Sequence, residues 1–343
     1  MRLDLAKSRL AIQWPLRGKV LTFFFILCLV SAAKAQSSTD EVHIAPGELA
    51  QSGALAALTL PKGPDQLIKV AVELVLVPVT IVDDRNRQIK GLQSDNFDLY
   101  ENKRQQSIRY FSSEDTPVSV GIVLDVSGSM KTKIERAREA VMEFIKSANP
   151  DDEFFLVTFS DAPDDRSDFT QRVEDIQNQL VFVRPNGRTA LLDALQLAMT
   201  KMRTARYQRR ALLVISDGGD NHSRYTEGEV KSAFKEADVA MYAIGIYDRV
   251  FATSEEMMGP AMLTDLADLT GGRAFTIDNP NDLMPAAKAI GNELRNQYLL
   301  GYKPQTNRDG KWHKIKIKFR RPEHVKLPPV RVYAKQGYYA PTD

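Results

Sequence analysis

The sequence predicts an α/β fold in which a doubly wound, mostly parallel sheet is covered by helices on both faces. Between about Pro117 and Arg295, short apolar runs alternate with longer segments of helical periodicity. The apolar runs are hydrophobic almost without interruption, which is typical of strands that are buried on both faces. They comprise residues 118–124, 154–159, 211–215, 239–246 and 273–277.

The segments between these runs have the spacing of amphipathic helices. After the first run, apolar residues recur every three or four positions, at Ile134, Ala137, Val141, Phe144 and Ile145. Similar patterns lie near residues 189–203, 226–236, 260–269 and 281–295. Strand and helix therefore alternate along residues 117–295, as a parallel sheet with helical crossovers requires.

Segments of β character flank this domain on both sides. Before it, residues 69–81 form a β-branched run, and Pro78 within that run predicts a bulge or an edge strand. After it, residues 298–302, 314–320, 330–334 and 337–339 again indicate strands. The sequence therefore predicts a β-sandwich, in which residues 68–113 pack with residues 296–343 and the α/β domain is inserted between or flanked by them.

The N-terminus has the features of an export signal. Basic residues precede the apolar run 20–30, and small residues ending at Ala35 follow it, which predicts cleavage after Ala35. The apolar run is shorter than the roughly 20 residues that span a bilayer, so a retained anchor is the alternative. Residues 36–67 are rich in Ser, Ala, Gly and Pro and predict a flexible linker. We expect an exported protein, periplasmic, outer-surface or secreted, with no stable membrane span after cleavage.

Charge and cysteine content argue against nucleic acid as a partner and against disulfide bonds. Six of the 46 basic residues and one of the 44 acidic residues lie in residues 1–35, so the rest carries 40 and 43, a net charge of −3. A near-neutral charge argues against nucleic acid as the main partner. The single cysteine, Cys28, lies within the signal segment, so the processed chain has no disulfide.

Three oxygen-bearing side chains follow the first apolar run. In the segment VGIVLDVSGSM, Asp125, Ser127 and Ser129 occupy alternate positions where the predicted strand ends. Ligands of open α/β sheets gather at this edge, so the three side chains can converge on one point. Carboxylate and hydroxyl oxygens suit a hard cation such as Mg²⁺.

This segment resembles the metal-ion-dependent adhesion site of von Willebrand factor A (VWA) domains, whose pattern is Asp-x-Ser-x-Ser, then a Thr, then an Asp. Thr189 in PNGRTALLDAL and Asp217 in ALLVISDGGD match the later positions, whereas Arg188 stands where many relatives have a second glycine. The resemblance implies that Mg²⁺ or Mn²⁺ is held by five residues: Asp125, Ser127, Ser129, Thr189 and Asp217. It also implies a non-enzymatic binding module, in which an Asp or Glu of another exported or cell-surface protein completes the coordination of the metal.

The flanking segments have a resemblance of their own. Residues 77–112, together with the stretches NQYLLGYKP, GKWHKIKIKF and QGYYAP, are similar to a bacterial group of VWFA-related secreted proteins of the acidobacterial type. This resemblance covers roughly residues 69–341 and implies export.

Other interpretations of the same residues stay open. Asp and Ser also favour helix caps and turns, so the site residues could be purely structural and the protein a scaffold with a vestigial metal site. A Mg²⁺-dependent hydrolase of the haloacid dehalogenase type would need an acid two residues after Asp125, where Ser127 stands. No G-x-S-x-G motif surrounds the serines, and no histidine spacing suggests zinc, although His222 could border the site.

Overall fold

The computed structural model describes residues 74–217, 219–247, 254–305, 309–322 and 327–342. The predicted signal (1–35) and linker (36–67) lie outside these residues. The chain divides into two units, residues 1–67 and 68–343, and the description below concerns the second. Among the described residues, no helix is both long and apolar enough to cross a membrane.

A six-stranded sheet forms the centre of the α/β domain, in the order β10-β9-β8-β5-β6-β7. Five strands are parallel, and β7 pairs antiparallel with β6 at one edge. The predicted doubly wound, mostly parallel sheet is therefore confirmed. The strands are β5 (Ser119–Asp125), β6 (Glu153–Phe159), β7 (Pro163–Thr170), β8 (Arg210–Ser216), β9 (Ala240–Ile246) and β10 (Ala274–Ile277).

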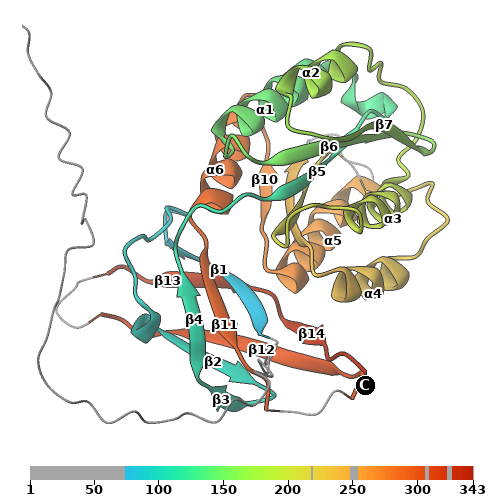
Figure 1. The fold of residues 1–343 in the computed structure, drawn as a ribbon. Helices are drawn as coiled ribbons and strands as arrows, with labels where there is room; N and C mark the ends of the chain where they lie inside the picture. Colours follow the sequence, from blue (N-terminus) through green and yellow to red (C-terminus); the bar gives the residue numbers. More distant parts are fainter. Residues whose placement is uncertain (1–73, 218, 248–253, 306–308, 323–326, 343) are drawn as a thin grey trace, which may run out of the picture. The chain divides into compact units, whose positions relative to one another are not determined.

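Helices cover both faces of this sheet and create two separate cores (Figure 1). The core on one face is closed by α1 (Ile134–Ser147), α2 (Val173–Val181) and α6 (Leu283–Arg295). The core on the other face is closed by α3 (Leu191–Met202), α4 (Glu227–Ala237) and α5 (Ser254–Thr270). Strands β5, β6, β8 and β9 contribute to both cores, which explains their continuous hydrophobic runs.

The remaining strands form two antiparallel sheets, ordered β13-β1-β11-β4 and β14-β12-β2-β3. Each sheet combines strands from before and after the α/β domain, and their apolar faces share one core. The strands are β1 (Val75–Asp83), β2 (Phe97–Glu101), β3 (Arg104–Gln106), β4 (Ile108–Ser112), β11 (Tyr298–Tyr302), β12 (Trp312–Phe319), β13 (Val330–Ala334) and β14 (Gly337–Tyr339). Short 3₁₀ turns complete the described elements: η1 (Ser94–Asn96), η2 (Gly128–Thr132) and η3 (Pro280–Asp282).

The expectation that Pro78 marks a bulge or an edge strand is wrong, because β1 lies inside its sheet. The pairing of β1 is staggered: residues 75–79 pair with β11, and residues 79–83 pair with β13. Pro78 faces Leu299 of β11, while the pairing with β13 begins one residue later, at Val79. The proline is therefore tolerated because its strand is paired on only one side at that point.

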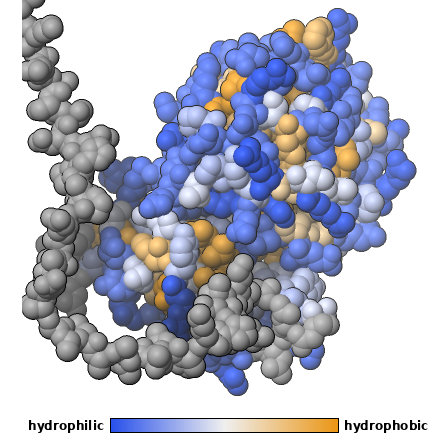
Figure 2. Space-filling model, in the orientation of Figure 1, coloured by the Kyte–Doolittle hydropathy of each residue, from blue (hydrophilic) through white to orange (hydrophobic). Residues whose placement is uncertain are grey.

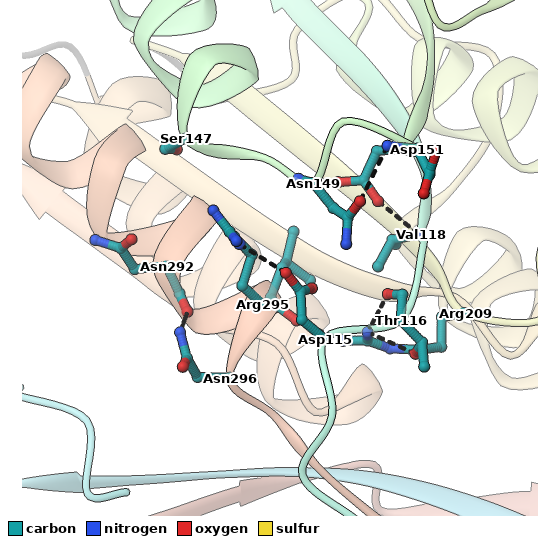
Figure 3. Close-up of polar contacts among 12 residues, drawn as sticks. Asp115, Thr116, Val118, Ser147, Asn149, Asp151, Arg209, Asn292, Arg295 and Asn296 are labelled. Carbon is teal, nitrogen blue, oxygen red and sulfur yellow. Dashed lines mark hydrogen bonds and ion pairs between the residues drawn. The ribbon is translucent and has the colours of Figure 1, made fainter. Parts of the chain in front are cut away.

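Polar contacts fix the two connections by which the chain enters and leaves the α/β domain (Figure 3). Asp115 in the entering connection pairs with Arg295 at the end of α6 at 2.8 Å. The guanidinium of Arg209 donates to the carbonyl oxygen of Thr116 at 2.6 Å and to the side-chain oxygen of Gln297 at 3.1 Å. Arg209 therefore holds both connections together at the base of β8.

A buried charged cluster lies within the β-sandwich, around His313 of β12. Its Nδ1 lies 2.8 Å from an Oε1 of Glu101, and its Nε2 lies 3.0 Å from an Oδ1 of Asp309. Tyr338 donates to the same oxygen of Glu101 at 2.9 Å. Burial alone would lower the pKa of His313, but the two carboxylates outweigh it and raise this pKa.

We expect His313→Gln to destabilise the protein by about 2 kcal/mol or more at pH 6, because Glu101 would lose a charged partner inside the sandwich. A raised folded-state pKa contributes stability that is complete below the unfolded pKa and is lost as pH rises through the folded value. The difference between wild type and variant should therefore shrink from pH 6 to pH 9, measured by urea unfolding. A difference that is constant over this range would show that His313 does not titrate as inferred.

Candidate metal centre

The candidate site lies where β5 and β8 end, at the carboxyl edge of the central sheet. Asp125 is the last residue of β5, and η2 begins three residues later at Gly128. Asp217 directly follows β8, and Thr189 lies just before α3. Neighbouring parallel strands end at the same edge, so β5 and β8 bring residues 92 positions apart together.

Hydrogen bonds link four of the five predicted residues directly. Asp125 accepts the backbone N–H of Ser127 at 2.8 Å. The hydroxyl oxygens of Ser127 and Ser129 lie 3.0 Å apart, and Ser129 donates to an Oδ1 of Asp217 at 2.8 Å. Asp125, Ser127 and Asp217 are buried, whereas Ser129 is exposed. The cluster therefore opens to solvent on the side of Ser129.

Backbone contacts place the Thr189 loop beside this cluster. Gly128 donates to the carbonyl oxygen of Gly187 at 3.0 Å, and Asn186 donates to that of Val126 at 2.9 Å. Thr189 is 5% exposed, and its backbone N–H donates to the side chain of Asn221 at 3.0 Å. The backbone of its loop therefore places Thr189 beside the cluster, whereas the other four residues are linked by direct hydrogen bonds.

Gly187 has a backbone conformation that other residues adopt with strain. Its φ is +75°, and a Cβ there would lie 2.4 Å from an oxygen of Asp161. The departure at Arg188 does not disturb this turn, because Arg188 donates its backbone N–H to Asp161 at 3.0 Å and holds the loop from the side.

Gly187→Ala should therefore lower the free energy of unfolding by about 1–2 kcal/mol, measured by chemical denaturation. A matched control is Gly228→Ala in the first turn of α4, where φ is helical and a Cβ meets nothing closer than 4.0 Å. That control should gain a few tenths of a kcal/mol to about 1 kcal/mol. Equal effects of the two substitutions would contradict the role given to the Gly187 turn.

The charged form of Asp125 is disfavoured in the site. Burial, followed by the repulsion of Asp217, raises the pKa of Asp125 to about 6. Hydrogen bonds from Ser127 and from the hydroxyl of Ser216, at 2.6 Å, oppose this shift without cancelling it. Because Asp217 repels the charged form of Asp125, a cation between them would be stabilised.

Three residues of the site were missed by the sequence analysis: Lys133, Ser216 and Tyr247. Lys133 Nζ lies 2.6 Å from an Oδ2 of Asp217. Tyr247 follows β9 at the same edge of the sheet, and its buried hydroxyl has no hydrogen-bond partner among the described residues. Burial and then the carboxylates of Asp217 and Asp125 raise its pKa. Position was the available signal, since each residue lies at a strand end or one helical turn from Ser129.

The donor set suits a hard divalent cation such as Mg²⁺, because it combines two carboxylates with neutral hydroxyl oxygens. Within the described ranges, no three His, Cys, Asp or Glu side chains form a metal-binding group. A cation here would therefore depend on the hydroxyls of Ser127, Ser129 and Thr189 as well as on the acids. The unsatisfied hydroxyl of Tyr247 could hydrogen-bond to a water on such a cation.

His222 borders the site through its backbone. Its N–H donates to the carbonyl oxygen of Thr189 at 3.2 Å, beside the N–H of Asn221 at 3.0 Å. The loop that carries both is anchored on α3, where Asp220 accepts the N–H of Leu192 at 2.9 Å. These contacts hold the loop after β8 against the loop before α3, and so they fix the position of Thr189.

Comparison with known proteins bears on the domain that holds this site. Residues 120–219 match the family model described as von Willebrand factor type A domain. An uncharacterized protein of Borreliella burgdorferi is 26% identical over 186 residues, which cover 46% of this chain and 53% of that protein. Inter-alpha-trypsin inhibitor heavy chain H4 of Sus scrofa is 25% identical over 168 residues, 44% of this chain and 18% of that protein. The chain thus spans about half the length of the first relative and less of the second.

A comparison with solved structures also finds a von Willebrand factor type A protein. A von Willebrand factor type A protein from Catenulispora acidiphila is 15% identical, with a TM-score of 0.45 over 71% of this chain and 75% of that one.

Proposed function

From the premise that this chain contains a von Willebrand factor type A domain, we propose that it is a non-enzymatic binding module that recognises another protein through a divalent cation. The cation, Mg²⁺ or Mn²⁺, would be held by Asp125, Ser127, Ser129, Thr189 and Asp217. The observation that carries the proposal is the hydrogen-bonded chain from Asp125 through both serines to Asp217. These hydrogen bonds hold the hydroxyls of both serines beside Asp217, and a cation would stabilise the two acids.

The partner class follows from the charge of the site. The charges of two carboxylates equal that of a divalent cation, and the hydroxyl ligands are neutral. An acidic side chain of a partner can therefore complete the coordination of the cation. The surface of the α/β domain that is visible in Figure 2 is mainly hydrophilic, with hydrophobic side chains in small separate patches. Recognition on such a surface would depend on charge and coordination more than on apolar contact. We therefore propose an Asp or Glu of the partner as the ligand.

Export is part of the same proposal. The signal-like features of residues 1–35 and the similarity of the flanking segments to VWFA-related secreted proteins support a periplasmic, outer-surface or secreted location. The partner would then be another exported or cell-surface protein.

The test is Mn²⁺ binding by calorimetry to the full chain, for wild type and Asp125→Asn. Saturable wild-type binding that the variant loses supports the proposal, and a pull-down with and without chelator then seeks the partner. Asp168→Asn is the matched control, because Asp168 is a fully exposed aspartate of β7, paired with Lys201 at 3.0 Å. Absence of binding in all three proteins, both without and with sodium acetate as a carboxylate ligand, would favour the second candidate, a scaffold with a vestigial site.

A further inference from the structure

Lys133 is the cation that the site already contains. Its ammonium lies 2.6 Å from Asp217 Oδ2, and the two side chains are 17% and 0% exposed. The backbone fixes Lys133 on both sides, because its N–H donates to Met130 at 2.9 Å and its carbonyl oxygen accepts from Ala137 at 3.0 Å. Lys133 is therefore held at the junction of η2 and α1, with its side chain directed into the site.

Asp217 divides its two oxygens between two neighbours. One oxygen accepts from the hydroxyl of Ser129 at 2.8 Å, and the other pairs with Lys133. We assign the oxygen beside Ser129 to the proposed metal, because Ser129 is one of its proposed ligands. The other oxygen pairs with the ammonium of Lys133. Lys133 and a bound metal would consequently share one carboxylate instead of excluding each other.

The local charge balance changes when Lys133 is counted. The carboxylates of Asp125 and Asp217 contribute two negative charges, a divalent cation two positive charges, and Lys133 one more. Asp161 and Asp193 have arginine partners, Arg188 at 3.7 Å and Arg224 at 3.8 Å, and the carboxylate of Asp220 accepts the N–H groups of Leu192 and Ser223 on the side of α3. Asp125, Asp217, Lys133 and a divalent cation would together carry a net positive charge in a partly buried place, where charges interact more strongly than in water.

We propose that Lys133 determines the ligand class of the site: it weakens the hold on the metal alone and makes metal binding depend on an anionic carboxylate ligand. This inference rests on the proposed metal site. The ammonium repels the cation, so the empty site binds metal weakly. A carboxylate ligand interacts favourably with both the metal and the ammonium, so metal and ligand each raise the affinity for the other.

The experiment compares Mn²⁺ binding to the full chain, with and without sodium acetate as the carboxylate probe, at slightly alkaline pH. Lys133→Gln should bind Mn²⁺ alone at least about tenfold more tightly than wild type. Acetate should raise the affinity of wild type several-fold, and that of Lys133→Gln less. Lys133→Arg, which keeps the charge, should behave as wild type. Lys131→Gln is the matched control: Lys131 is an exposed lysine two residues earlier, so this substitution should change the affinity less than twofold.

The outcomes separate this inference from the proposed function. If wild type binds Mn²⁺, Asp125→Asn does not, and Lys133→Gln matches wild type within twofold, the role of Lys133 is overturned while the metal site stands. Equal effects of Lys131→Gln and Lys133→Gln would also overturn it, because general surface charge would then explain both. If wild type and Lys133→Gln both fail to bind Mn²⁺ even with acetate present, the proposed function itself fails. Thermal unfolding of each variant with and without Mn²⁺ gives a second measure, and Lys133→Gln should gain more from the metal than wild type.

Discussion

Arg273→Ala should lower the free energy of unfolding by about 3–5 kcal/mol. Arg273 is 5% exposed and pairs with Glu293 of α6, which is equally buried. Burial raises the pKa of Glu293, and Arg273 opposes this shift. Removing the arginine would leave an acid without its cation inside the protein, which is costly.

Arg273 also joins the α/β domain to the β-sandwich. Its guanidinium donates to the side chain of Asn86 at 3.0 Å and lies over the rings of Phe275 and Tyr333, 4.6 and 4.8 Å from their centroids. Arg273→Lys should recover only part of the loss, because an ammonium lacks the planar group that stacks between two rings.

Urea unfolding of wild type and Arg273→Ala measures this loss. Lys288→Ala is the control. Lys288 is an exposed cation of α6, the helix that carries Glu293, and its Nζ lies 3.7 Å from a carboxylate oxygen of Glu143. That surface pair should contribute at most about 1 kcal/mol. A loss below 1 kcal/mol for Arg273→Ala would contradict the stabilising role given to its buried pair with Glu293 and to its contacts with Asn86 and Tyr333.

The second large effect concerns Asp125, whose neutralisation should stabilise the metal-free protein while abolishing metal binding. Asp125 is completely buried, and its pKa of about 6 means that ionisation at neutral pH opposes folding. Asn has nearly the same shape, so Asp125→Asn should raise the free energy of unfolding by about 1–2 kcal/mol without metal. With Mn²⁺ at about a hundred times its dissociation constant, only wild type should gain, by about 2.7 kcal/mol.

The order of stability should therefore reverse on adding Mn²⁺, which unfolding curves with metal and with chelator can measure. Asp168→Asn should change neither value by more than about 0.5 kcal/mol. If Asp125→Asn destabilises the metal-free protein instead, the residue is mainly a structural acceptor for Ser127 and Ser216, as in the scaffold alternative.

Much of the fold could be predicted because burial leaves a direct pattern in the sequence. Strands β5, β6, β8 and β9 are covered on both faces, so almost every residue in them is apolar. Strand β7 was missed because it lies at the edge of the sheet and carries three aspartates in PDDRSDFT. Charge on an edge strand prevents further pairing, and it removes the hydrophobic signal at the same time.

The candidate site was predictable only in part. The spacing of Asp125, Ser127 and Ser129 is local, and it was visible in the sequence. Lys133 is close to Ser129 in the sequence, but it pairs with Asp217 only because β5 and β8 are neighbours. Tyr247 comes near the acids only because β9 lies beside β8, and periodicity does not give this strand order. His313 likewise looked like one of several scattered histidines, because its partner Glu101 lies 212 residues away in the chain.

The interleaving of strands in the β-sandwich also sets an order of events during synthesis. Val75 of β1 pairs with Tyr302 of β11, so the first described strand waits for more than 200 residues before its partner exists. The α/β domain between them has all its strands and helices by Arg295 and can form on the emerging chain. Strands β1 to β4 meanwhile expose pairing edges, which invite wrong partners. Strands β11 to β14 therefore supply the missing partners of the earlier strands, and a chain stalled before Tyr298 would carry a folded α/β domain next to unpaired, aggregation-prone strands.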